Sequence, residues 1–65
     1  MDLKEARKKA GMSMEELGRA VGVSSVAIWR YEHGERVPKV EIAKRLGKLL
    51  GFEWYRLMDN DKKAG

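Results

Sequence analysis

The stretch that decides the fold runs from residue 13 to residue 34 and reads Ser-Met-Glu-Glu-Leu-Gly-Arg-Ala-Val-Gly-Val-Ser-Ser-Val-Ala-Ile-Trp-Arg-Tyr-Glu-His-Gly. It contains two helix-start signals. Ser13 and, three residues later, Glu16 form a Ser-x-x-Glu capping box. Ser24 is placed to cap a second helix. The stretch therefore predicts two short helices, over 14–21 and 25–33, joined by a tight turn at Gly22-Val23.

Apolar residues recur at helical spacing on both sides of this stretch. They predict further helices over 2–10 and 40–50, each followed by a glycine, and a last short helix or turn over 52–58. In the helix over 40–50 the expected buried stripe is Val40, Ala43, Leu46 and Leu50. Strand-like alternation is absent from the sequence. The predicted fold is all-α, a compact bundle of five short helices in one domain over 1–58, followed by a polar tail over 59–65.

Composition narrows the classes of function. The chain has 65 residues, no cysteine and one histidine, so it offers neither a disulfide framework nor a set of metal ligands. No apolar run approaches the roughly 20 residues of a membrane span. A glycine-rich phosphate loop and a nucleophile with a histidine base are also missing, so we expect no enzyme, cofactor or metal. The net charge of +4 is compatible with a polyanionic partner, although many small domains carry a similar excess.

The predicted third helix divides into two sides. A projection of residues 24–33 places three residues on the side expected to pack on the domain, namely Ser24, Ile28 and Tyr31. The opposite side carries Ser25, Val26, Trp29, Arg30 and His33. In a DNA major groove Arg30 would bond guanine, Val26 would touch a thymine methyl, and Ser25 would reach a base edge or a phosphate. Two interpretations of Trp29 stay open, a contact in the groove or a cover for the edge of the core. His33 is favoured as a partner of the helix dipole.

Positions from residue 3 to about residue 58 combine into a specific pattern. They are Leu3, Arg7, Gly11-Met12-Ser13, Leu17, Gly22-Val23-Ser24, Ile28, Tyr31-Glu32, Gly34, Pro38 and Leu50-Gly51-Phe52. This pattern resembles the lambda-repressor-like (Cro/XRE) helix-turn-helix family. The resemblance implies a DNA-binding domain that docks its third helix in the major groove. The second helix and the loop after the third would then hold the phosphates.

The family's functional positions carry over to this chain with three departures, one of which is Glu53 in place of the serine or threonine that often caps the last helix. Met14 stands where such proteins often have glutamine, so only its backbone N–H remains for a phosphate. Gly18 replaces the usual alanine. The implied base contacts are Ser25, Val26, Trp29 and Arg30, and the implied phosphate contacts are Met14, Arg19, Ser24, Arg36 and Lys39. The resemblance also implies an ion pair between Arg7 and Glu32.

Together these features predict sequence-specific binding of double-stranded DNA by a transcription regulator, of the phage or mobile-element repressor type. We expect a homodimer on a palindromic operator-type site, with Trp54, Leu57 and Met58 supplying an apolar contact. The expected location is the cytoplasm of a bacterial, archaeal or phage-infected cell, with no membrane partner. The alternative is a protein-interaction module, such as an antitoxin or a bridging coactivator.

Overall fold

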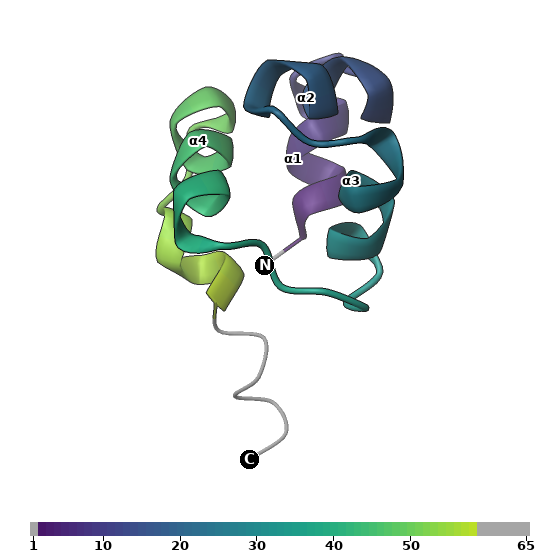
Figure 1. Ribbon diagram of the computed structural model, residues 1–65. Helices are drawn as coiled ribbons and strands as arrows, with labels where there is room; N and C mark the ends of the chain where they lie inside the picture. Colours follow the sequence, from purple (N-terminus) through teal and green to yellow (C-terminus); the bar gives the residue numbers. More distant parts are fainter. Residues whose placement is uncertain (1, 59–65) are drawn as a thin grey trace.

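Four α-helices make up most of the computed structural model, which describes residues 2–58. They are α1 (Leu3–Lys9), α2 (Met14–Val21), α3 (Ser25–Glu32) and α4 (Val40–Leu50), and a 3₁₀ turn over 54–58 follows them. In Figure 1, α4 stands on one side of the molecule and α2 and α3 on the other, with α1 behind them. The most extensive packing is between α2 and α3, and α1 contacts α3 while α2 contacts α4. The all-α prediction is confirmed for the described residues, none of which forms a strand.

Side-chain caps start the first three helices. The Asp2 carboxylate accepts from the Glu5 N–H at 3.1 Å, and Ser24 Oγ accepts from the Ala27 N–H at the same distance. At α2 the capping box is complete, because Ser13 Oγ accepts from Glu16 N–H and Glu16 accepts from Ser13 N–H. The predicted starts of α2 and α3 are therefore confirmed. The predicted ends of the first and third helices are each one residue too long.

The core is small and draws on every helix. Its buried apolar side chains are Leu3, Leu17, Val21, Ile28, Ala43, Leu46 and Leu57. Met12 and Val23, which precede the caps of α2 and α3, are partly buried against this cluster. Each therefore anchors the chain to the core just before its helix begins, as expected of a hydrophobic staple. In the described part, no helix has the length and apolar character needed to cross a bilayer.

The predicted count of five helices is wrong by one, because the segment after α4, expected to be a short helix or a turn, forms a 3₁₀ turn. The Arg56 N–H donates to the Glu53 carbonyl at 3.0 Å, a bond from residue i+3 to residue i. Gly47 explains how close this turn lies to α4. A Cβ on Gly47 would stand 2.6 Å from the Phe52 carbonyl oxygen, so the chain folds back directly over the glycine.

Two residues expected in the core are exposed. Val40 is the first residue of α4 and lies on the solvent side, whereas Gly47 takes a buried place on that helix. Ser24 is also exposed, because its hydroxyl is engaged as the cap of α3. The predicted tail over 59–65 lies outside the described residues.

Candidate nucleic-acid interface

The turn between α2 and α3 fixes how the two helices cross. Gly22 has a left-handed backbone with φ of 87°, and its N–H and that of Val23 both donate to the Gly18 carbonyl at 2.8 Å. A Cβ on Gly18 would lie 2.6 Å from the Val23 carbonyl oxygen. Glycine at position 18 therefore lets the start of α3 approach α2 more closely than the alanine usual in the resembling family would.

The side of α3 that faces away from the core carries the predicted base-contacting residues. Val26 is 57% exposed and Trp29 39% exposed, and Arg30 and His33 are exposed as well. Ser25 is half-buried, so it offers less of its surface than the projection suggested. Ile28 of the same helix is completely buried, which orients α3 with one side inward. The structure thus brings Val26, Trp29 and Arg30 to one exposed side of α3.

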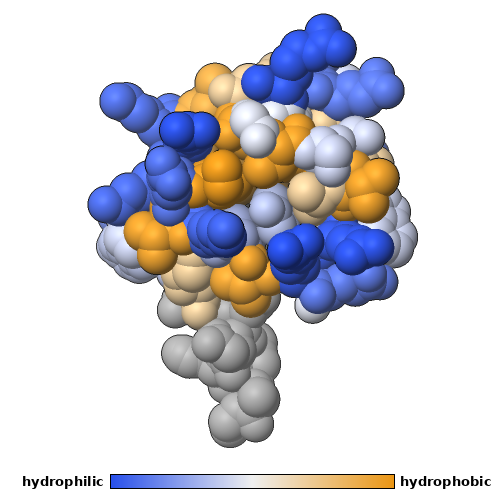
Figure 2. Space-filling model, in the orientation of Figure 1, coloured by the Kyte–Doolittle hydropathy of each residue, from blue (hydrophilic) through white to orange (hydrophobic). Residues whose placement is uncertain are grey.

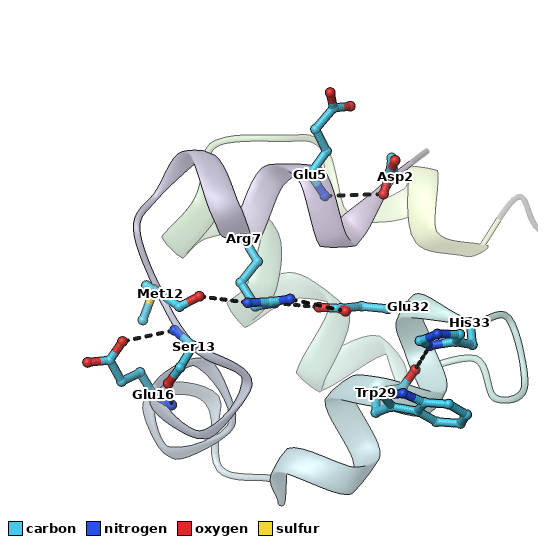
Figure 3. A network of polar contacts seen from close by, with 9 residues as sticks. All are labelled: Asp2, Glu5, Arg7, Met12, Ser13, Glu16, Trp29, Glu32 and His33. Atoms are coloured by element: carbon cyan, nitrogen blue, oxygen red, sulfur yellow. Dashed lines mark hydrogen bonds and ion pairs between the residues drawn. The ribbon is translucent and has the colours of Figure 1, made fainter.

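Trp29 makes its clearest contact with His33. The two rings stack with centroids 3.9 Å apart and planes 21° apart (Figure 3). His33 Nδ1 lies 2.8 Å from the Trp29 carbonyl oxygen. A carbonyl oxygen only accepts, so Nδ1 carries the proton in this contact. His33 therefore bonds the last turn of α3, as a partner at the helix C-terminus is expected to do.

The six arginines of the chain, all in its described part, divide into two groups. Arg7, Arg45 and Arg56 each form an ion pair with a glutamate. Arg19, Arg30 and Arg36 make no side-chain hydrogen bond or ion pair with any residue of 2–58. Those three are the arginines expected to contact DNA, on α2, on α3 and in the loop that follows α3. Their charges are available to a partner without first breaking an internal pair.

The remaining predicted phosphate contacts differ in their surroundings. Lys39 is exposed and directly precedes α4, whose first backbone N–H groups have no side-chain cap. Ser24 is exposed, and its hydroxyl keeps a donor because its oxygen is the cap acceptor. Met14 begins α2 beside Glu15 and Glu16. Two carboxylates repel a phosphate, so Met14 has the least favourable electrostatics of the set.

The ion pair expected between α1 and α3 is present in the structure. Arg7 Nε lies 2.6 Å from Glu32 Oε2, and the two side chains are only 8% and 1% exposed. Arg7 Nη1 also donates to the Met12 carbonyl at 2.8 Å (Figure 3). This pairing leaves Arg7 engaged inside the domain. It anchors the last residue of α3 to α1.

Arg45 has a role that the sequence analysis did not predict. Arg45 Nη1 donates to the Val21 carbonyl at 3.1 Å and so satisfies an acceptor at the end of α2. The same guanidinium lies 3.6 Å from Glu41. Helical periodicity gives no signal for such a contact, because its partner belongs to another helix.

The visible face of the molecule combines apolar and charged groups. Figure 2 shows hydrophobic side chains gathered near the middle of the face drawn in Figure 1, with hydrophilic residues around them. Large apolar side chains exposed in the described part are Val26, Trp29, Val37, Val40, Leu49 and Tyr55.

Comparison with known proteins agrees with this geometry. A family model described as Helix-turn-helix matches residues 3–57. The chain belongs to this helix-turn-helix family. The lambda-repressor-like resemblance of the sequence is thereby confirmed. No solved structure gives a significant match to the chain.

Individual helix-turn-helix relatives come from bacteria and archaea. The HTH-type transcriptional regulator YqaF of Bacillus subtilis is 35% identical over 52 residues, which cover 80% of this chain and 68% of YqaF. An HTH-type transcriptional regulator of Methanothermobacter thermautotrophicus is 37% identical over 51 residues, covering 78% of this chain and 74% of the relative. A regulatory protein of Pyrococcus abyssi is 43% identical over 47 residues, but these span only 15% of its length. The domain thus makes up most of some relatives and a small part of others.

Proposed function

We propose that this helix-turn-helix domain binds double-stranded DNA in a sequence-specific manner and acts as a transcription regulator. The observation that carries the proposal is the exposed side of α3, which Arg30, without an ion pair within residues 2–58, shares with the exposed Val26 and Trp29. Arginine bonds guanine bidentately in the major groove, and apolar groups contact the thymine methyl. The base contacts would come from Ser25, Val26, Trp29 and Arg30.

Affinity would come mainly from the phosphates on either side of that groove. Arg19 on α2, Arg36 in the loop after α3 and Lys39 at the start of α4 flank the reading helix in the chain. With Ser24 and the Met14 N–H they form the proposed phosphate contacts. The family relatives whose names describe them as transcriptional regulators support this assignment.

Two copies of the chain would bind together on a palindromic operator, as a repressor of phage or mobile-element type does. A dimer places its two reading helices about 34 Å apart, one turn of B-DNA. Leu57, expected to share in the contact between the copies, is buried in the core, whereas the partly buried Trp54 and Met58 would leave some apolar surface for it. The protein would bind such an operator in the cytoplasm of a bacterial, archaeal or phage-infected cell.

Selection from a pool of random duplexes tests the proposal. The protein should enrich one symmetric site, and its affinity for that site should fall steeply as salt rises. Recovery of a protein partner whose binding barely responds to salt, with no duplex enriched, would instead favour an antitoxin or coactivator role for the same fold.

A further inference from the structure

The Trp29 indole is held in place on the exposed side of α3. Its ring stacks on His33 at 3.9 Å between centroids, and the His33 Nδ1–H is tied to the Trp29 carbonyl (Figure 3). The indole is 39% exposed, and its stack on His33 limits the rotation of the ring.

A fixed aromatic ring is an economical contact surface. An indole loses few rotamers on binding, and a ring already held flat loses fewer still. Val26 precedes Trp29 by three residues and Arg30 by four, so the three side chains are neighbours on the helix surface. An exposed patch on α3 thus consists of Val26, Trp29, Arg30 and His33. Its apolar part, Val26 and Trp29, adjoins the guanidinium of Arg30, which has no internal partner within residues 2–58.

The bases of duplex DNA differ in how well their major-groove edges suit contact with Val26 and Trp29. In the major groove only thymine presents a methyl group, at C5. Cytosine and adenine present an amino donor there, which finds no acceptor on the Val26 or Trp29 side chain. Guanine supplies the two acceptors that match Arg30.

We propose that His33 is a positioning residue that holds Trp29 flat, so that Trp29 and Val26 recognise a thymine methyl beside the guanine bound by Arg30. This inference rests on the proposed DNA-binding function. It adds the class of base step that the domain prefers, a thymine next to a guanine.

Deoxyuridine provides the direct test, because it pairs as thymidine does and lacks only the methyl. Random duplex pools are prepared with either base, and the protein selects from both. The thymine pool should yield a site with thymine beside guanine, and replacing that thymine by uracil should weaken binding about fourfold, the effect of one buried methyl. Equal affinity for the two duplexes would overturn the inference while leaving sequence-specific binding intact. Absence of any enriched site in either pool would overturn the proposed function as well.

Variants of His33 test its role as a positioning residue. His33→Phe keeps a flat ring against Trp29, whereas His33→Ala removes it. The preference for thymine over uracil, measured as the ratio of the two affinities, should survive in His33→Phe and disappear in His33→Ala. The near-ultraviolet circular dichroism of Trp29, taken as the difference from Trp29→Phe, should weaken in parallel. An unchanged thymine preference in a folded His33→Ala protein would contradict the role.

Discussion

Arg7 and Glu32 join the first helix to the end of the third through a buried ion pair, with Arg7 Nε 2.6 Å from Glu32 Oε2. The same guanidinium donates to the Met12 carbonyl, so one side chain ties together α1, the loop before α2, and α3. No described side-chain polar atom that is buried lacks a hydrogen-bond partner. The orientation of the proposed reading helix therefore depends on a polar contact as well as on its apolar side.

Removing one member of this pair should destabilise the domain strongly. In Arg7→Met the Glu32 carboxylate stays buried without a cation, which costs about 3–5 kcal/mol of unfolding free energy. Urea denaturation measures the loss. The double variant Arg7→Met/Glu32→Leu should recover much of it, because the unpaired charge is gone. A single variant as stable as the double variant would show that the pair is not what holds the helices.

Gly18→Ala should destabilise the domain although alanine favours helices. The new Cβ would meet the Val23 carbonyl oxygen at 2.6 Å, and crowding of this kind costs about 1–3 kcal/mol. The gain in helix propensity is about 1 kcal/mol. Ala20→Gly on the exposed side of α2 measures the propensity term alone. A Gly18→Ala protein that melts at a higher temperature than the wild type would contradict the close approach.

Ser24 is predicted to act twice, as the cap of α3 and as a phosphate contact. Ser24→Asp keeps a good cap acceptor, so the stability should hardly change. The added charge should repel a phosphate and weaken DNA binding. Thermal melting and binding to the selected duplex separate the two effects. Ser24→Asn keeps a cap acceptor without the charge and is the matched control, and equal losses of affinity in Ser24→Asn and Ser24→Asp would argue against repulsion of a phosphate by the added charge.

Arg45 and Arg19 should respond in opposite ways to substitution. Arg45→Met removes the bond to the Val21 carbonyl and should lower stability by at most about 1 kcal/mol while leaving DNA affinity unchanged. Arg19→Met should leave stability unchanged and weaken binding to all duplexes alike. The slope of the logarithm of the binding constant against the logarithm of the salt concentration should fall in magnitude by about one. Salt titrations of both variants check this contrast. A reversed pattern would mean that the two arginines have been assigned the wrong roles.

The parts of the fold that follow from local signals could be predicted from the sequence. The boundaries of α2 and the start of α3 depend on Ser13, Glu16 and Ser24, whose partners lie three residues away. The choice between a helix and a turn after α4 could not be made from the sequence, because it depends on packing against α4. The contact of Arg45 could not be predicted either, because its partner lies on α2. In the sequence Gly47 is only a glycine within a helix. Its structural role, to leave room for the Phe52 carbonyl, depends on how the chain folds back after α4.

The candidate site divides in the same way. The exposed side of α3 follows from helical periodicity, and so does the exposure of Val26 and Arg30. Trp29 remained open between the groove and the core, since periodicity places a ring on a side without saying what it touches. Its stack on His33 depends on the rotamers of both side chains, which the sequence does not specify.

The central claim is that α3 reads a DNA sequence through Arg30, and binding of wild-type and Arg30→Ala proteins to two duplexes tests it most directly. One duplex is the site enriched by selection, and the other is an unrelated sequence of equal length. Arg30→Ala should lose about 1–3 kcal/mol of binding free energy on the selected site and little on the unrelated one. Equal losses on both duplexes would show that Arg30 contacts only phosphate, and the account of α3 as the reading helix would be wrong.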